Sequence, residues 1–414
     1  MPGVNDPSSL LDAPEVRHTV MAAAALAAQA LTDAEAPPEH RLRTLMESHG
    51  RIMAARGPSH PLTFAEFREL LTGDLDLLLP GEVPAEEMQG VRLITGDGQF
   101  DDDLYDLEAE QRLVLRTLSR LTRGGRSANG DDLEAEMDQE RAYAGLKKAM
   151  DQTVYVEGRK ALIDHPAGPV SKLRKLPLPS SVRQFYTDIP HAAVFDRWWF
   201  ACPVCEWPMR VTLQQTRGGR SGSVQCFHRP HRDFGAKYHF KIPADGGAPK
   251  LVPAASAPVA RSGNDKVLFP TVHGVTPQAT LVKDHAALTR GVWRWTTVPG
   301  LVEVALYEAL KARGLAPVLW PDLDSYDLQI EVAGAGEKTQ FRIDLKDYSH
   351  PLLLAQKIQA DKGDAGGADW LAVPDYRASS LPLLSRVCSE FGLSVSTAGD
   401  LGAKICEEAG VQWA

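Results

Sequence analysis

The sequence predicts a multidomain α+β protein with a helical N-terminal region, a small cysteine-rich module and a C-terminal α/β core. Apolar residues recur at helical spacing over most of residues 14–121. Three of the five cysteines gather between residues 202 and 226. Between residues 298 and 376, stretches that alternate as strands do lie between amphipathic helices, in the order αβββαβ. These patterns follow one another along the chain, so we expect separate domains.

Length and composition agree with this prediction. A chain of 414 residues is long enough for two or three domains, and 24% charged with 43% hydrophobic residues is typical of a soluble globular protein. The net charge of −9 argues against a protein that coats nucleic acid generally, but it leaves local basic patches open. Few, clustered cysteines indicate a reducing compartment. The chain shows neither a signal-peptide pattern nor an apolar stretch that could span a bilayer, so we expect a cytoplasmic protein without a membrane partner.

The first segment, residues 1–121, is predicted to be a helical domain. Thr63, followed by Glu66 three residues later, has the spacing of a capping box at a helix start. Residues 122–132 are rich in glycine, serine and charge, which is typical of a flexible linker. The predicted helices cover residues 15–33, 38–56, 64–71 and 102–121.

The next segment, residues 133–195, is predicted to be a helical and basic connector. From Glu157 to Lys241 the chain carries fourteen Lys or Arg and six Asp or Glu, a local net charge of +8. Such an asymmetry within an acidic protein is typical of a surface that contacts phosphates. Aromatic residues are interleaved with these charges, and we expect most of them to form the core of a small domain rather than to stack on bases. The candidate nucleic-acid contacts in this segment are Arg210, Arg217, Arg220 and Lys237.

Residues 196–245 have the cysteine spacing of a zinc ribbon. A first knuckle, Cys202-Pro-Val-Cys205, is separated by twenty residues from Cys226. Tetrahedral zinc needs a fourth ligand, which is His231 in a C-x4-H arrangement or His228 in a C-x-H arrangement. We favour His231, because the tighter spacing leaves little chain to wrap the metal. Four protein ligands leave no open position, so this zinc would be structural.

Residues 246–263 are rich in proline, alanine and glycine and are predicted to be a linker to the C-terminal domain, residues 264–414. In that domain, Pro299 and Gly300 mark the start of an amphipathic helix, and Gly314 marks its end. The predicted strands cover residues 315–322, 326–332, 341–348 and 369–375, with a helix at 350–361 before the last of them.

Four polar residues in this domain carry the functional prediction. Asp344 and Lys346 are two positions apart in a predicted strand, so their side chains share one face. A hairpin would bring Asp327, at the start of the preceding strand, beside them, and Glu303 lies in the first helix. Two carboxylates with the carbonyl of Leu345 are suitable ligands for a hard cation such as Mg²⁺ or Mn²⁺. A lysine beside that cation would stabilise charge on an attacked phosphate.

This pattern resembles the PD-(D/E)XK superfamily, the restriction-endonuclease-like nucleases, with Asp327, then Asp344-Leu345-Lys346, and Glu303 as the acid of the first helix. Lys346 is the one lysine of the sequence with an acidic residue two positions before it. The first motif departs from the family, because Asp327 follows a tyrosine and not a proline. Asp322, which does follow a proline, is our second choice, since Asp327 stands at the head of the strand.

The resemblance implies a Mg²⁺-dependent DNA endonuclease with a restriction-endonuclease-like core. Its catalytic residues would be Glu303, Asp327, Asp344 and Lys346, and Asp327, Asp344 and Leu345 would hold the metal. Gln356 and Lys357, on the following helix, are candidate contacts to the nucleic-acid backbone.

The order of segments, with GRKALIDHP and CPVCEWPMR, looks like the restriction-endonuclease-type proteins encoded beside prokaryotic Piwi-like proteins and helicases in antiviral defence. This finer resemblance implies DNA, a helicase and a Piwi-like protein as partners, and it leaves open whether the chain forms a homodimer. The alternative is a catalytically inactive nucleic-acid-binding adaptor that recruits partners through its zinc ribbon. A nuclease of transposition or recombination would share the same chemistry.

Overall fold

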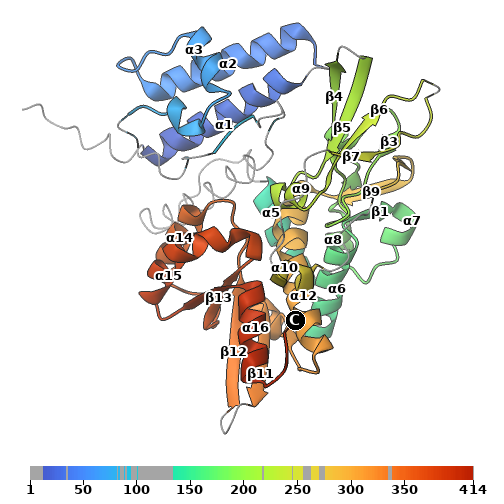
Figure 1. The fold of residues 1–414 in the computed structure, drawn as a ribbon, viewed down its shortest axis with the longest axis vertical. Helices are drawn as coiled ribbons and strands as arrows, with labels where there is room; N and C mark the ends of the chain where they lie inside the picture. The colour runs from blue at the N-terminus through green and yellow to red at the C-terminus, as the bar shows by residue number, and fades with distance from the viewer. Residues whose placement is uncertain are drawn as a thin grey trace, which may run out of the picture. The chain divides into compact units, whose positions relative to one another are not determined.

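The computed structural model describes residues 13–33, 36–81, 83, 88, 91–94, 100, 134–216, 219–244, 246–254, 263–269, 276–333 and 338–413. These residues form two compact units (Figure 1). The first unit comes from Met1–Arg126 together with Tyr348–Ala360, and the second from Ser127–Asp347 together with Asp361–Ala414. The chain therefore leaves the second unit directly after Asp347, adds one helix to the first, and returns.

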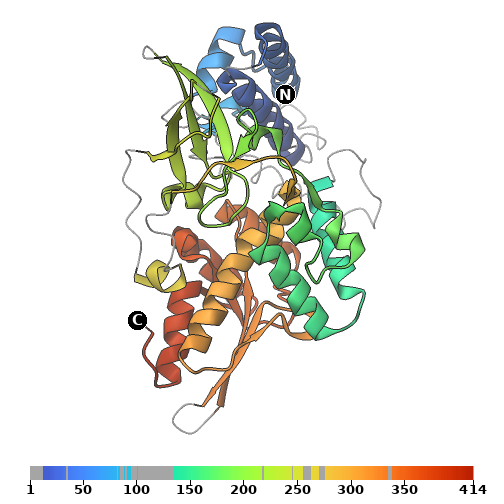
Figure 2. The same cartoon turned by 90° about the vertical axis from the view of Figure 1, so that its right-hand side faces the viewer.

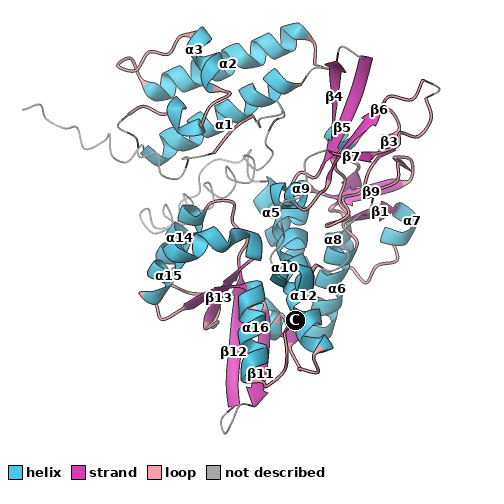
Figure 3. Cartoon of the chain, viewed as in Figure 1, coloured by secondary structure: helices cyan, strands magenta, loops and turns pink. Residues whose placement is uncertain are grey.

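Among the described residues of the first unit, the regular elements are helices (Figure 3). Its core combines the buried alanines of α1 with larger apolar side chains, among them Leu45, Ile52, Phe67 and Leu353. Because alanine side chains are small, α1 and α2 lie close together along their length. The elements are α1 (Ala13–Thr32), α2 (Pro38–Arg56), α3 (Phe64–Leu70), the 3-10 helix η2 (Leu75–Leu78) and α14 (Pro351–Ala360).

The capping box predicted at the start of α3 is confirmed. The Thr63 hydroxyl accepts a hydrogen bond from the Glu66 N–H at 3.2 Å, and the Thr63 N–H donates to the Glu66 carboxylate at 2.8 Å. The helices predicted at 15–33 and 38–56 are also present, as α1 and α2. The helix predicted at 102–121 lies outside the described residues.

A five-stranded mixed sheet is the centre of the second unit. Its strand order is β10-β11-β12-β13-β14; β10, β11 and β12 pair antiparallel, whereas β12, β13 and β14 pair parallel. Helices α12 and α16 lie side by side against this sheet (Figures 1 and 2). With α12 at the start and α14 between β12 and β13, the predicted order αβββαβ is present. The bounds are β10 (Val318–Leu319), β11 (Leu328–Ala333), β12 (Lys338–Leu345), β13 (Trp370–Val373), β14 (Ser394–Thr397), α12 (Val298–Ala312), the 3-10 helix η5 (Asp375–Ser380), α15 (Leu381–Ser389) and α16 (Ala398–Glu408).

Helix α12 is placed by its glycines. A Cβ atom at Gly300 would lie 2.4 Å from the side chain of Ile163, so only glycine allows α6 (Gln152–Asp164) to approach this closely. Gly314 has a φ of +78°, and its N–H donates to the carbonyl of Lys311 at 3.0 Å, which ends the helix as predicted. Before α12, the chain forms α11 (Arg290–Val292) and a π-helical turn, η4 (Trp293–Thr297).

The segment with the clustered cysteines folds as a four-stranded antiparallel sheet in the order β4-β5-β6-β7. Two smaller sheets, β1-β9-β2 and β3-β8, are formed by strands that precede and follow this sheet along the chain. Their bounds are β1 (Ala167–Pro169), β2 (Tyr186–Asp188), β3 (Trp198–Trp199), β4 (Arg210–Thr216), β5 (Gly219–Gln225), β6 (Lys237–Lys241), β7 (Val252–Pro253), β8 (Thr280–Leu281) and β9 (His285–Leu288). The helices of this part are α5 (Glu134–Lys147), α7 (Val170–Leu173), α8 (Ser180–Arg183), the 3-10 helix η3 (His191–Ala193), α9 (Arg229–Asp233) and α10 (Gly263–Leu268).

The cysteine-bearing segment and the five-stranded sheet share one hydrophobic core. The ring of Trp207 stacks on that of Trp293, with centroids 4.3 Å apart and planes 12° from parallel, and both side chains are buried. The indole N–H of Trp207 donates to the carbonyl of Leu288 at 2.9 Å. Offset aromatic stacking adds stabilisation beyond the buried area, so the cysteine-bearing segment packs on the chain that follows it. The structure therefore confirms an α+β protein with N-terminal helices and a C-terminal mixed sheet.

Candidate active site and metal cluster

Asp327 and Asp344 are brought together by the pairing of β11 with β12. The register pairs Leu328 with Ile343, and the Asp327 N–H donates to the Ile343 carbonyl at 2.9 Å, one step beyond the ladder. The Leu345 N–H in turn donates to the Asp327 carboxylate at 2.6 Å. The carboxylate of Asp327 is therefore held against the backbone of the Asp-Leu-Lys sequence.

Lys346 lies at the solvent-exposed side of this group, which we call its open side. Its ammonium group donates to the Asp344 carboxylate at 2.7 Å, and its side chain is 41% exposed, against 10% for Asp344. Its backbone N–H donates to the carbonyl of Ala372 at 2.9 Å, which continues the pairing of β12 with β13 beyond Leu345. Alternation along the strand thus puts the two charged side chains together, as residues two apart in a strand require.

Glu303 is directed away from the open side, towards α6. It is 2% exposed, and its two carboxylate oxygens accept from one terminal nitrogen of Arg159 at 2.7 and 3.0 Å. The indole N–H of Trp320 donates to the same carboxylate at 2.5 Å. Charge-assisted bonds of this kind hold Glu303 in a single orientation.

Arg159 links Glu303 to two further acids. One terminal nitrogen lies 3.3 Å from the Asp327 carboxylate, and the other forms a short ion pair with Asp324. The guanidinium carbon lies 4.5 Å from the ring centre of Trp320, a cation–π contact. Arg159 belongs to the basic segment that we expected to contact phosphates, but for this residue that expectation is wrong, because its side chain is buried against acids.

The second choice for the first motif, Asp322, lies outside this group. Trp320, Asp322, Leu323 and Asp324 all have φ between 47° and 72°, in the left-handed region that non-glycine residues seldom adopt. This tight turn leaves Asp322 exposed and directs Asp324 to Arg159 and to the hydroxyl of Tyr155, which donates to it at 2.8 Å.

Acidic side chains outnumber basic ones in this group, and this disfavours the ionised form of its buried acids. Burial, followed by the charges of Glu303 and Asp344, raises the pKa of Asp327 well above its ordinary value, although Arg159 and Lys346 act in the opposite direction. Burial also raises the pKa of Glu303, against the effect of Arg159. Four carboxylates (Asp324 is the fourth) and two cations give these six side chains a formal charge of −2. A divalent cation with oxygen ligands fits this balance.

Residues 300–413 match the family model described as "REase associating with pPIWI_RE". The predicted resemblance to restriction-endonuclease-type proteins of Piwi-associated systems is therefore confirmed for these residues, which we call the REase segment. The segment contains Glu303, Asp327, Asp344 and Lys346, whereas Arg159 and the clustered cysteines precede it. No curated protein and no solved structure matches the chain. Among the described residues, no helix is long and apolar enough to cross a membrane.

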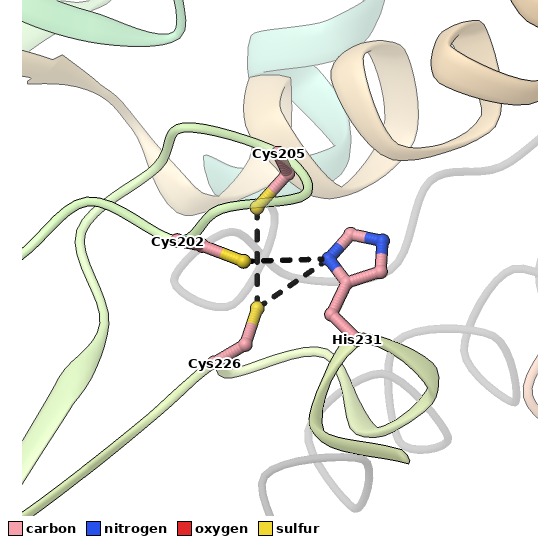
Figure 4. A group of neighbouring side chains, drawn as sticks. All are labelled: Cys202, Cys205, Cys226 and His231. Atoms are coloured by element: carbon pink, nitrogen blue, oxygen red, sulfur yellow. Dashed lines mark hydrogen bonds between the residues drawn. The ribbon is translucent and has the colours of Figure 1, made fainter. Parts of the chain in front are cut away.

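Ahead of the REase segment, three cysteines and one histidine form a buried cluster (Figure 4). The donor atoms of Cys202, Cys205, Cys226 and His231 all lie within 4.8 Å of one another. The sulfur of Cys226 lies 3.9 Å from that of Cys205 and 3.5 Å from the Nδ1 atom of His231. Tetrahedral ligands with zinc–sulfur bonds of about 2.3 Å stand about 3.8 Å apart, sulfur to sulfur, and a few tenths less from sulfur to nitrogen. The cluster is thus consistent with a structural zinc site.

Proton affinities in this cluster differ between its thiols. Burial acts to raise the pKa of Cys202, but hydrogen bonds from the other two thiols hold it well below its ordinary value. Burial, followed by hydrogen bonds with Cys202 and Cys205, raises the pKa of Cys226 well above its ordinary value. Metal binding would release the protons of these thiols, because zinc is bound by thiolates.

His231, the favoured histidine, belongs to the cluster, whereas His228 has another contact. The Nε2 atom of His228 lies 3.5 Å from the carboxylate of Asp347, the residue after Lys346. Burial, followed by the charges of His231 and Arg294, lowers the pKa of His228 well below its ordinary value, so the imidazole is neutral. Its backbone N–H donates to the sulfur of Cys226 at 3.4 Å.

Asp347 is the centre of a buried polar group that sequence reasoning missed. Its carboxylate accepts from Arg377 at 2.9 Å and from the Tyr376 hydroxyl at 2.9 Å, and its carbonyl accepts from Arg294 at 2.9 Å. Burial acts to raise the pKa of Asp347, but Arg377 and Arg294 hold it below its ordinary value, so the carboxylate is ionised. This group links the end of β12 to η4 and to the turn after β13.

The predicted nucleic-acid contacts are found in separate places. Arg210 starts β4, and its guanidinium carbon lies 4.9 Å from the ring centre of Phe227; Lys237 starts β6. Arg217 lies outside the described residues, as does the side chain of Arg220. The remaining two, Gln356 and Lys357, lie on α14 and so belong to the first unit, whereas Asp344 belongs to the second.

Proposed function

We propose that the chain is a Mg²⁺-dependent endonuclease that hydrolyses phosphodiester bonds of DNA. The observation that supports this proposal most is the neighbouring pair Asp327 and Asp344, with Lys346 at the end of β12. These residues lie inside a segment that matches a family described as REases. The description of that family names association with pPIWI_RE, which supports a Piwi-like protein as a partner. A helicase partner and a role in prokaryotic antiviral defence are part of this proposal and rest on the order of the segments in the sequence.

Asp327, Asp344 and the carbonyl of Leu345 are the residues that would hold Mg²⁺, or Mn²⁺ in its place. When bound, such a cation activates water and offsets charge on the phosphate. Lys346 is exposed enough to reach a phosphate while its ammonium group stays hydrogen-bonded to Asp344. A fixed positive charge at this place stabilises the charge that develops on the phosphate oxygens. The Leu345 N–H holds the Asp327 carboxylate in place before any ligand arrives.

The four-ligand cluster has a different role in this proposal. Cys202, Cys205, Cys226 and His231 would bind one zinc and leave it no open position, so the metal would stabilise the ribbon without taking part in hydrolysis. The hairpin of β4 and β5, with Arg210, Arg217 and Arg220, is the proposed contact to the nucleic-acid backbone, together with Lys237.

The test is the incubation of purified full-length protein with supercoiled and linear DNA, with Mg²⁺ or with EDTA. We expect nicking and linearisation with Mg²⁺ alone, and a loss of at least about 100-fold in rate for Lys346→Ala, since removing one charge-stabilising group has an effect of this size. Lys338→Ala is the matched control, because Lys338 lies on the same strand, exposed and paired with Glu331. Equal rates in the two lysine variants would contradict the assignment of Lys346.

One observation supports a second candidate, the inactive adaptor. Arg159 and Lys346 already give the carboxylates partial compensation from within the protein. An adaptor would bind DNA as tightly as the endonuclease but leave it intact with Mg²⁺ and with Mn²⁺, and its binding would not change with Asp344→Asn.

A further inference from the structure

The bonding of Glu303 bears on how many metal ions the proposed site binds. Both of its oxygens accept from Arg159, and one also accepts from Trp320. Within the part of the chain that the structure describes, Glu303, Asp327 and Asp344 do not bring their oxygens within 4.8 Å of one another, whereas the cysteine–histidine cluster does meet this spacing. Glu303 is thus bonded to protein cations and donors and does not converge with the two aspartates.

The exposure of the side chains also separates Glu303 from the two aspartates. The side chains of Glu303 and Arg159 are 2% and 3% exposed, whereas those of Asp327 and Asp344 are 9% and 10% exposed, and that of Lys346 is 41% exposed. A hydrated cation and a phosphate would arrive from the side of Lys346. They would meet the two aspartates first, with Glu303 behind them.

The charge of Arg159 explains why Glu303 is tolerated in this place. An isolated buried carboxylate is costly, but a guanidinium with good geometry compensates for it. The same guanidinium is fixed by the rings of Trp320 and Tyr143, with its carbon 4.5 and 5.2 Å from their centres. Arg159 therefore keeps one position, from which it contacts Asp327 at 3.3 Å.

We infer that Arg159 is a positioning residue that takes Glu303 out of the metal-ligand set, so that the site binds a single divalent cation through Asp327 and Asp344. This inference rests on the proposed function and specifies the metal stoichiometry of that same site. Glu303 and Arg159 then form a closed pair that orients Asp327, and α6 supplies part of the nuclease site from outside the REase segment.

The experiment is Mn²⁺ binding to the full-length protein, measured by calorimetry for stoichiometry and by electron paramagnetic resonance for metal–metal coupling. We expect one Mn²⁺ per chain with an uncoupled spectrum. Glu303→Gln should weaken binding, because the guanidinium of Arg159 loses its partner and its charge acts on Asp327 instead. Adding Arg159→Met removes that charge, so the double variant should bind within about threefold of wild type. Asp327→Asn serves as the site control and should lose at least about tenfold in affinity.

The outcomes separate this inference from the proposed function. Two Mn²⁺ per chain with a coupled spectrum, or a folded double variant that stays as weak as Glu303→Gln, would overturn the role assigned to Arg159 and leave the metal site in place. No Mn²⁺ binding to wild-type protein would overturn the proposed function and this inference with it. The wild-type spectrum decides the stoichiometry even where Arg159→Met does not fold.

Discussion

At the scale of single residues, the strand period predicted which side chains lie together. Asp344 and Lys346 were predicted on one face because they are two apart, and Asp327 was preferred because it heads the neighbouring strand; the structure brings the three side chains together. Arg159 was missed as a partner of these acids. It is separated from Asp327 by 168 positions, and no local pattern indicates that a basic residue of α6 is buried against acids.

The raised pKa of Asp327 gives a pH prediction. Its folded pKa lies well above the unfolded value of about 3.9, so between these two values the folded state binds more protons and stability falls as pH rises. In Mg²⁺-free buffer, unfolding by urea should therefore show lower stability at neutral pH than near pH 4, after allowance for other groups. Asp327→Asn should reduce this fall, and Mg²⁺ should stabilise wild type but not the variant at pH 7. A fall of equal size in both proteins would contradict the assignment.

Asp344 gives a second prediction at this scale. Asp344→Asn keeps the shape of the side chain but loses its charge, so it should weaken Mg²⁺ binding and lower DNA cleavage by at least about 100-fold with little change in melting temperature. Glu331→Gln is the control, since Glu331 is an exposed acid on the neighbouring strand, paired with Lys338. If Asp344→Asn melts far below this control, Asp344 serves packing rather than chemistry.

At the scale of elements, the order αβββαβ followed from sequence periodicity, but the partner of each element did not. Helix α14 has the amphipathic pattern of a crossover helix, yet it belongs to the first unit, and its Leu353 joins the core of that unit. Its pattern shows that one face is buried but not which surface buries it. The predicted division between ribbon (196–245) and C-terminal domain (264–414) stays a prediction, although the stacked Trp207 and Trp293 join their cores.

The shared core predicts that loss of zinc affects the whole second unit. Cys202→Ser should remove about one zinc per chain and lower the melting temperature of the second unit, because metal binding contributes much of the folding free energy of small metal sites. Cleavage should fall as well, since His228 contacts Asp347 directly after Lys346. Zinc analysis, calorimetry and plasmid nicking measure the three effects. Cys388→Ala is the control, because Cys388 is a buried free thiol outside the cluster, and it should keep its zinc.

At the scale of the whole molecule, an acidic protein carries a basic stretch. The structure shows that the charge of this stretch available to a ligand is lower than its composition suggests. Of the fourteen basic residues between Glu157 and Lys241, Arg159 and Arg232 are buried and cannot serve a phosphate surface. Burial of a charged side chain depends on partners distant in sequence, so composition alone overestimates the charge that a ligand meets.

The remaining charges predict a salt-dependent affinity for duplex DNA. Each phosphate contact contributes about 0.9 to the slope of log affinity against log salt concentration, through release of counterions. Reversing the charge of two arginines in the sequence between Arg210 and Gln225, by Arg217→Glu with Arg220→Glu, should therefore flatten the slope by about 2 or more. Lys311→Glu with Lys404→Glu makes the same charge change on α12 and α16, outside the basic stretch, and should leave the slope nearly unchanged. Fluorescence anisotropy between about 50 and 200 mM salt measures both slopes. Equal slopes in the two double variants would mean that overall charge, and not the hairpin, draws the protein to DNA.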